Sequence, residues 1–167
     1  MRSDFTVRDL CLAAVMTALV FVATFVPKIP IPLGYAHLGD AVIFILILTI
    51  PRKDALIAAC LGSALADLLG GFPLWIIPTI IIKLLMAESA LRIAVTKKSR
   101  SQIKIIAGFL IGSLIMAAGY TIFGAILFAS VTAALASTPG LLMEGLLNSI
   151  IAIIILKFIP NLTFGRH

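Results

Sequence analysis

The chain has 167 residues, of which 62% are hydrophobic and 12% charged, and its mean hydropathy is +1.21. Soluble domains are about half apolar and about a quarter charged, so a water-soluble fold of this size is excluded. The formal net charge of +6 fits basic residues in cytoplasmic loops better than nucleic-acid binding. The composition therefore predicts a multi-pass membrane protein.

Six apolar runs predict one all-α domain over residues 1–167, a polytopic membrane protein with six transmembrane helices. The expected helices cover residues 10–26, 38–50, 55–69, 74–94, 105–128 and 141–159. Pro27, Pro30 and Pro32 end the first helix and favour an extended path after it. The second run is short for a span, so it begins earlier, near Leu33, or lies behind this proline-rich loop. Residues 130–140 are rich in small side chains and are expected to form an outer loop.

Basic residues are distributed unevenly between the two sides of the predicted membrane domain. With the N-terminus inside, eleven of the thirteen Lys and Arg residues fall at cytoplasmic ends of helices or in cytoplasmic segments. The outer loops carry only Lys28, and Lys83 lies within a span. This asymmetry predicts that both termini are cytoplasmic.

Polar side chains at membrane depth are costly and mark candidate sites. Several of them are expected at one outward-facing level although they come from different helices, and they predict a pocket that is open to the outside. The candidate substrate-binding residues are Tyr35, His37, Asp40, Trp75, Lys83, Glu144 and Asn148. Trp75 or Tyr35 can stack on a heteroaromatic ring, and the other side chains can form hydrogen bonds or meet a charge.

Each candidate also has an interpretation that involves no ligand. Asp40 can stabilise the positive N-terminus of the second helix, and His37 can be a solvated loop residue. Trp75 fits an aromatic belt at the membrane surface. Asp67, which lies at the same level, is interpreted as a cap for the loop that begins at Gly70.

Lys83 is the deepest basic residue, and a buried ammonium needs a partner. The available carboxylates on the outer side are Asp40, Asp67 and Glu144. The sequence leaves open which of them pairs with Lys83, and whether a pair of Lys83 with Glu144 is only structural.

Small residues at four-residue spacing form a second pattern. Ala14 and Ala18 make an AxxxA step in the first helix, residues 55–66 contain similar steps, and Gly108 and Gly112 lie in the fifth helix. Such faces let helices approach closely. They predict either packing inside the bundle or docking of another membrane subunit.

Motifs for catalysis and nucleotide binding are absent from these 167 residues. The chain has no GxxxxGK[ST] phosphate loop, no HExxH and no GxSxG. It has two histidines and two isolated cysteines, so no metal or disulfide framework is expected. We therefore expect a protein that is not an enzyme.

The whole chain resembles the S components of energy-coupling factor (ECF) transporters in its size, its six spans and its topology. The resemblance also rests on the AxxxA step at Ala14 and Ala18 and on residues 34–41, GYAHLGDA, which lead into the second helix. The GYAHLGDA segment looks like the subgroup of hydroxymethylpyrimidine, pyridoxine and riboflavin carriers.

This resemblance implies a substrate-specificity subunit of an ATP-driven importer in the bacterial cell membrane. Such a subunit captures a vitamin or a vitamin precursor outside and delivers it inward with a transmembrane coupling subunit and two cytoplasmic ATPases. These partners hydrolyse ATP, so no cofactor is expected in this chain. The resemblance implies that Ala14 and Ala18, with Ala13 beside them, meet the coupling subunit, and that residues 27–37 form a lid over the pocket.

A pyridoxine-like or hydroxymethylpyrimidine-like ligand is expected, because a cofactor with several phosphates would need more basic groups than Lys28 and Lys83. Three other hypotheses compete with this one. The first is a stand-alone transporter coupled to protons through Asp40, Asp67 and Glu144. The second is an intramembrane enzyme, and the third is a structural subunit without a ligand.

Overall fold

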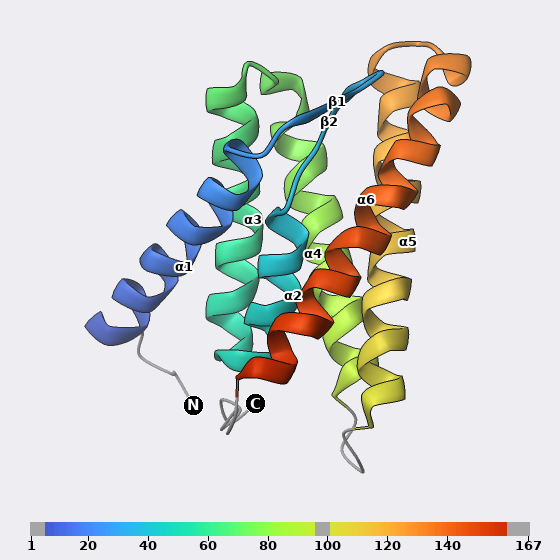
Figure 1. Cartoon of the computed structure of the whole chain (residues 1–167). Coiled ribbons are helices and arrows are strands. Elements are labelled where there is room, and N and C mark those ends of the chain that lie inside the picture. Colours follow the sequence, from blue (N-terminus) through green and yellow to red (C-terminus); the bar gives the residue numbers. More distant parts are fainter. Residues whose placement is uncertain (1–5, 96–100, 160–167) are drawn as a thin grey trace.

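The computed structural model describes residues 6–95 and 101–159, which form six α-helices, a β-hairpin and a short 3-10 helix. In chain order the elements are α1 (Val7–Phe25), β1 (Ile29–Ile31), β2 (Gly34–Ala36), α2 (Gly39–Thr49), α3 (Arg52–Gly70), η1 (Pro73–Trp75), α4 (Ile76–Ala94), α5 (Gln102–Leu127) and α6 (Val131–Phe158). The helices form one bundle, and the hairpin lies across one of its ends (Figure 1). The start of α1 and the end of α6 lie at the opposite end.

Local sequence signals set several helix boundaries. Thr6 and Asp9 form a capping box at the start of α1, in which the Thr6 side chain accepts from the Asp9 amide and the Asp9 carboxylate accepts from the Thr6 amide. Helix α3 ends at Gly71, whose φ of 85° lies in the left-handed region that glycine adopts readily. The structure confirms the predicted all-helical fold of the bundle, and it adds a two-stranded hairpin that was not predicted.

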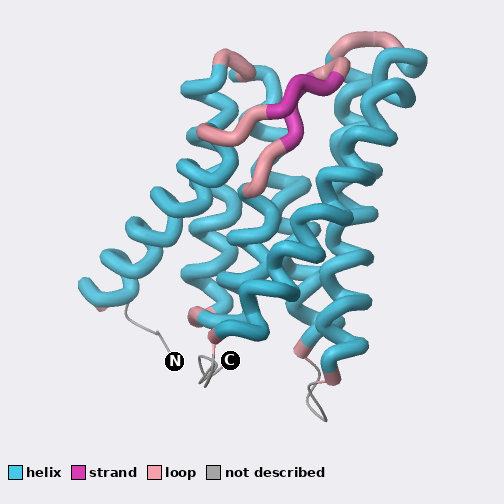
Figure 2. Tube along the Cα trace, in the orientation of Figure 1, coloured by secondary structure: helices cyan, strands magenta, loops and turns pink. Residues whose placement is uncertain are grey.

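The proline-rich segment after α1 folds into an antiparallel hairpin. Ile29 pairs with Ala36 and Ile31 pairs with Gly34. The strands lie against the helix ends instead of extending away from them, as Figure 2 shows. Extended backbone is tolerated next to a bilayer only where protein covers it, so this position explains how the expected extended path is accommodated.

Helix α2 is short and lies at the centre of the bundle. Its eleven residues span about 16 Å, roughly half the thickness of a bilayer core. Ile43, Phe44 and Ile47 are fully buried, and the Phe44 ring stacks on Phe109 of α5 with 4.6 Å between centroids. Because α2 begins at Gly39, the structure confirms that it lies behind the hairpin and does not begin near Leu33.

The prediction of a loop at residues 130–140 is wrong, because α6 begins at Val131 and continues through Pro139. Ser130 caps the helix by accepting a hydrogen bond from the Ala133 amide. Ser137 and Thr138 donate their hydroxyl groups to backbone carbonyls one turn earlier.

Most of the small-residue steps serve packing inside the bundle. A Cβ atom at Gly62 would lie 2.7 Å from the Thr17 carbonyl oxygen, so α1 and α3 touch backbone to backbone there. A Cβ atom at Gly108 would lie 2.6 Å from the Ala90 carbonyl oxygen of α4. The docking interpretation is therefore excluded for these glycines of α3 and α5.

Four helical stretches among the described residues are long and apolar enough to cross a membrane. They are Val7–Phe25, Pro73–Ala94, Gln102–Leu127 and Val131–Phe158. Helix α2 is apolar but shorter, and α3 carries Arg52, Lys53 and Asp54 in its first turn. The count of six spans and the cytoplasmic position of both termini stay predictions.

Candidate functional site

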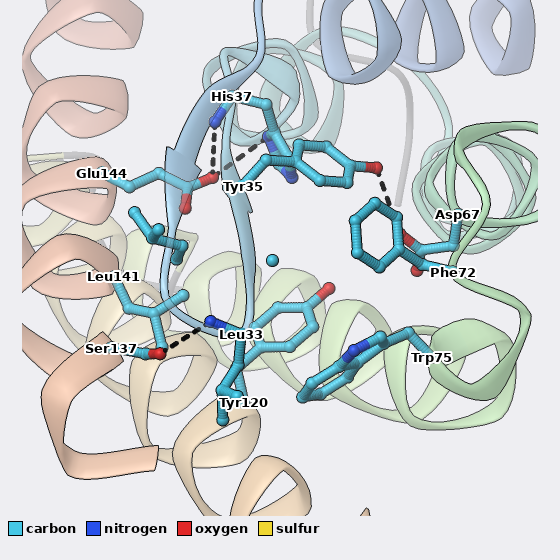
Figure 3. Close-up of a pocket in the computed structure, with 12 residues that line it drawn as sticks. Leu33, Tyr35, His37, Asp67, Phe72, Trp75, Tyr120, Ser137, Leu141 and Glu144 are labelled. Carbon is cyan, nitrogen blue, oxygen red and sulfur yellow. Dashed lines mark hydrogen bonds and ion pairs between the residues drawn. The ribbon is translucent and has the colours of Figure 1, made fainter. Parts of the chain in front are cut away.

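A cavity lies between the hairpin and the helix ends beneath it (Figure 3). Its volume is about 50 Å³. The lining residues are Ile31, Leu33, Gly34, Tyr35, His37, Asp67, Phe72, Trp75, Tyr120, Ser137, Leu141 and Glu144. They come from the hairpin and its flanks, from α3, α5 and α6, and from η1 and the turn before it, so the hairpin covers the cavity as a lid. We use "the lid" for residues 27–38, which include the hairpin and its flanking turns.

Hydrogen bonds tie the lid to α6 at three places. The Leu33 amide donates to Ser137 Oγ at 3.1 Å, and the His37 amide donates to Glu144 Oε1 at 3.2 Å. Asn148 Nδ2 donates to the His37 carbonyl oxygen at 2.8 Å. These bonds pair backbone groups of the lid that would otherwise be buried without partners.

Asp67 organises the side of the cavity formed by α3 and α4. Its carboxylate accepts from the Tyr35 hydroxyl at 3.2 Å and from Thr79 Oγ1 at 2.5 Å. The Tyr120 hydroxyl lies 3.1 Å from Thr79 Oγ1 and continues the network. Burial and the nearby Asp67 charge raise the pKa of Tyr35, so the phenol stays protonated as a donor.

His37 and Glu144 meet on the opposite side of the cavity. His37 Nδ1 lies 3.1 Å from Glu144 Oε1 and also accepts a hydrogen bond from the Gly39 amide at 3.1 Å. Burial, followed by the positive charge of Lys83, lowers the pKa of His37 to about 3. The imidazole is therefore neutral.

Asp40 and Lys83 form an ion pair beneath the cavity. Their oxygen and nitrogen atoms are 2.5 Å apart, and both residues have 0% exposure. Lys83 Nζ also lies 5.3 Å from the centroid of the Tyr120 ring, in reach of a cation–π contact. Neither residue lines the cavity. The structure thus identifies Asp40 as the partner of Lys83 and rules out a Lys83–Glu144 pair.

Aromatic rings form much of the remaining cavity wall. Trp75 is only 6% exposed, and its ring centroid lies 5.4 Å from that of Tyr120. Its Nε1 atom is buried and has no hydrogen-bond partner among the described residues. Trp75 therefore belongs to the cavity wall, and the interpretation as a surface belt residue is wrong.

The structure brings four of the seven predicted binding residues to the cavity. Tyr35, His37, Trp75 and Glu144 line it. Asp40 and Lys83 form an ion pair with each other below the cavity. The expectation that they line the cavity is therefore wrong for this conformation. Asn148 is also corrected, because its amide is fully used by backbone groups.

The bonds of Asn148 show why it is not available to a ligand. Its Nδ2 donates to the carbonyl oxygens of His37 and Glu144, and its Oδ1 accepts from the Ala41 amide at 2.9 Å. Both amide hydrogens are used. Asn148 therefore positions the lid and the start of α2.

Sequence reasoning missed several cavity residues. Asp67 was interpreted as a loop cap, yet only its backbone carbonyl does this, by accepting from the Phe72 amide. Tyr120 and Phe72 were not singled out, although an isolated tyrosine in an apolar run was a usable signal. Ser137 was missed because residues 130–140 were expected to be a loop, and Leu141 was not singled out at the start of the expected sixth helix.

The predicted docking residues lie on different faces of α1. Ala14 and Ala18 are exposed, whereas Ala13 is 4% exposed and faces the bundle. Ala13 is therefore not on the exposed face of α1, and the prediction that it meets the coupling subunit together with Ala14 and Ala18 is corrected. Helix α1 packs mainly on α3 and, less extensively, on α2, at the edge of the bundle (Figure 1).

Comparison with known proteins supplies three similarities. The family model described as "ECF-type riboflavin transporter, S component" matches residues 4–160. An uncharacterized protein of Pyrococcus woesei is 31% identical over 111 residues, which are 65% of this chain and 73% of that protein. A solved structure titled "Structure and mechanism of the S component of a bacterial ECF transporter" covers 90% of this chain and 94% of its own, with a TM-score of 0.72 at 20% identity. At this identity the structural match establishes the fold.

Proposed function

Because the chain belongs to the ECF-type riboflavin transporter S component family, we propose that it captures a small vitamin or vitamin precursor for an ATP-driven importer. The chain is a transporter subunit and not an enzyme. The observation that carries the proposal is the cavity under the lid, which combines aromatic walls with buried acidic groups at one end of the bundle. Sites for small molecules are usually concave and largely apolar, with a few placed polar groups.

We propose a ligand with a single ring, similar to pyridoxine or hydroxymethylpyrimidine. The cavity of about 50 Å³ is much smaller than typical ligand pockets of about 300–1,000 Å³. A ligand must therefore displace the lid or the side chains, and one ring requires the smallest movement. The three-ring flavin named in the family description requires a larger one.

The proposal includes partners that this chain does not contain. A transmembrane coupling subunit would dock on the exposed face of α1 around Ala14 and Ala18, where small side chains permit close approach. Two cytoplasmic ATPases would supply the energy, since the 167 residues contain no phosphate loop.

We place the lid end outside a bacterial plasma membrane and both termini in the cytoplasm. Arg52, Arg92 and Lys157 lie at helix ends opposite the lid, and Lys28 lies in the lid itself. This distribution supports the orientation.

Transport measurements in vesicles distinguish this function from a stand-alone transporter that uses Asp67 and Glu144 for protons. We expect the chain alone to bind radiolabelled hydroxymethylpyrimidine or pyridoxine without accumulating it under a proton gradient. Uptake should require the coupling subunit, both ATPases and internal ATP. Accumulation by the chain alone, driven by a proton gradient and indifferent to ATP, would reject the proposal.

A further inference from the structure

We propose that the cavity selects a positively charged heteroaromatic base, held between the carboxyl groups of Asp67 and Glu144. This inference rests on the proposed function and names the charge class of its substrate. The argument comes from the charges, the free hydrogen-bonding groups and the rings that line the cavity.

The charge of the cavity wall is one-sided. Among the residues that line it, Asp67 and Glu144 are acidic, and none is a lysine or an arginine. Lys83 is buried below the cavity, where Asp40 pairs with its charge. Lys28 lies in the lid, with its ammonium 4.0 Å from the Phe25 ring centroid and 4.6 Å from the Tyr35 ring centroid, so it is the positive charge that a ligand cation would have to displace or avoid. A ligand cation would therefore meet opposite charge that no residue of the wall compensates.

The cavity wall has unused hydrogen-bonding atoms on both sides of the space that the ring of a ligand would occupy. Glu144 Oε2 has no hydrogen bond among the described residues, and it is drawn without one in Figure 3. Each Asp67 oxygen accepts one bond and retains capacity for another. Trp75 Nε1 is a buried donor without a partner. The ligand that satisfies these groups directs its positive charge and a hydroxyl or amino donor toward the carboxyl groups, and it offers an acceptor, such as a hydroxyl oxygen or an unprotonated ring nitrogen, to Trp75.

The ring faces complete the match. Tyr35, Phe72, Trp75 and Tyr120 all contribute to the cavity wall. Aromatic faces attract cations, and the attraction is greatest for tryptophan and for sites removed from water. A flat cationic ring gains both stacking and this electrostatic contribution, whereas a neutral ring of the same shape gains only stacking.

The closed cavity also shows how a cation would displace a proton. His37 Nδ1 lies 3.1 Å from Glu144 Oε1, so one proton is shared in this contact, and Nδ1 also lies 3.1 Å from the Gly39 amide nitrogen. Glu144 is buried without an ion pair to a lysine or arginine among the described residues, which favours its neutral form in the covered cavity. Binding of a cation would favour release of this proton and leave a carboxylate beside the ligand.

Several charged or titratable groups surround Glu144 and are part of this equilibrium. They are His37 of the lid, Asp40 of α2, Asp67 of α3, Lys83 of α4 and, across the cavity, Tyr35 and Tyr120. Lys83 and Asp40 offset each other, and the other carboxylate, Asp67, disfavours a second negative charge. A ligand cation is what makes ionisation of Glu144 favourable.

The test uses two probes of nearly equal shape. One is N-methyl-3-(hydroxymethyl)pyridinium, which is permanently charged, and the other is 3-methylbenzyl alcohol, its neutral counterpart. Trp75 is the only tryptophan of the chain and lies in the cavity wall, so its fluorescence reports binding to the purified protein. We expect the charged probe to bind at least about tenfold more tightly than the neutral one, an effect of about 1.4 kcal/mol.

Two variants locate the effect. Asp67→Asn and Glu144→Gln should each weaken binding of the charged probe about tenfold and leave that of the neutral probe unchanged. Asp54→Asn is the matched control, because Asp54 is a buried carboxylate in the first turn of α3, at the other end of the bundle. The comparison of the two probes on the unmodified protein does not depend on how well any variant folds.

The pH profile adds a readout that a merely structural role would not change. Affinity for the permanently charged probe should rise with pH as Glu144 loses its proton, and then level off. Affinity for 4-amino-5-hydroxymethyl-2-methylpyrimidine should rise and then fall, because this base loses its own charge at high pH. Glu144→Gln should remove the rise in both profiles.

Two outcomes separate this inference from the proposed function. Equal affinity for the charged and neutral probes, or tight binding of a neutral vitamin that is insensitive to Glu144→Gln, would overturn the charge preference and leave the vitamin-binding function intact. Absence of binding by both probes and by a panel of vitamins would overturn both.

Discussion

The described part of the chain has four buried acidic side chains, and their surroundings differ. Asp40 is matched by the Lys83 ammonium, and Asp67 is held by hydroxyl groups of Tyr35 and Thr79. Glu144 contacts the neutral His37 and accepts from its amide. A charge in the protein interior is stable only with a partner, so the Asp40–Lys83 pair contributes to the fold while the other carboxyl groups remain available at the cavity. The fourth, Asp54, lies at the far end of the bundle and outside the site.

Replacing Lys83 with alanine should destabilise the protein strongly. The change leaves Asp40 buried without its ion-pair partner, which costs about 3–5 kcal/mol. Thermal unfolding in detergent measures the effect. Arg52→Ala removes one partner of an exposed ion pair with Glu88 and should cost at most about 1 kcal/mol. Equal loss in the two variants would show that Lys83 is a bystander.

Replacing Asn148 with leucine should loosen the lid. The variant leaves the His37 carbonyl and the Ala41 amide without their side-chain partner, at a cost of about 1–3 kcal/mol for each unsatisfied group. Amide hydrogen exchange over residues 33–41 should accelerate. Ser149→Ala, next to it on α6, removes bonds to α5 and α6 only and should leave the lid unchanged. Slow exchange in both variants would contradict the assigned role of Asn148.

The depth of the cavity along the bundle was predictable from single polar residues, but the contacts between their side chains were not. Polar residues at one predicted level included Tyr35, His37, Trp75 and Glu144, which do line the cavity, because membrane depth makes such residues informative. Their role in substrate binding stays a prediction. The choice of Asp40 as partner for Lys83 depends on helix rotation and tilt, which residue spacing does not determine.

The helices have separate roles, and α1 has the smallest buried share of the four helical stretches that are long and apolar enough to cross a membrane. Its buried residues are Ala13, Val20 and Thr24, which contact the bundle. Ala14 and Ala18 lie on the free side, one turn apart. We propose that this face meets the coupling subunit, as a small-residue surface permits close helix contact.

Ala14→Trp and Ala18→Trp should block assembly with the coupling subunit and abolish uptake, while ligand binding by the isolated chain stays within about twofold, which corresponds to less than about 0.5 kcal/mol. The bulky ring prevents close approach at the free face. Co-purification with the coupling subunit measures assembly, and binding of radiolabelled ligand to the isolated chain measures ligand affinity. Leu19→Trp is the control, since Leu19 is exposed on α1 and already large. Normal uptake in both alanine variants would refute this docking face.

Element boundaries were predicted unevenly. The extended proline-rich segment and the end of α3 were predicted from prolines and glycines, which are local signals. The start of α1 was expected at residue 10, because the Thr6 cap that places it at Val7 was not used. The first turns of α6 were missed because Pro139 and the small residues were interpreted as loop signals. Alanine is a strong helix former, and the Ser130 cap was the signal that would have placed the helix start.

At the scale of the whole molecule, the two ends of the bundle differ in chemistry. The lid end carries the cavity, and the opposite end carries the exposed Arg52, Glu88 and Arg92 network. Large apolar side chains are exposed along the helices between these ends, as expected where lipid replaces water. The composition predicted this membrane character, and the family match confirms the predicted resemblance to S components.

Cysteine labelling of intact cells tests the orientation of the bundle. In a background with Cys11 and Cys60 changed to serine, Thr132→Cys lies at the lid end and Gln102→Cys at the other. A membrane-impermeant maleimide should label Thr132→Cys in intact cells and label Gln102→Cys only after permeabilisation, since basic residues favour the cytoplasm. The reverse pattern would invert the topology and place the cavity inside the cell.

Capture of a small molecule in the cavity under the lid is tested most directly by native mass spectrometry of the purified chain, with extraction and identification of any retained compound. Leu141→Trp is the comparison, because Leu141 lines the cavity and a larger ring there would fill it. We predict that the unmodified chain retains a vitamin or precursor, or acquires one from an added panel, and that Leu141→Trp loses it while remaining folded. Failure of the unmodified chain to bind any compound, or equal retention by a folded Leu141→Trp variant, would contradict the assignment of this cavity as the binding site.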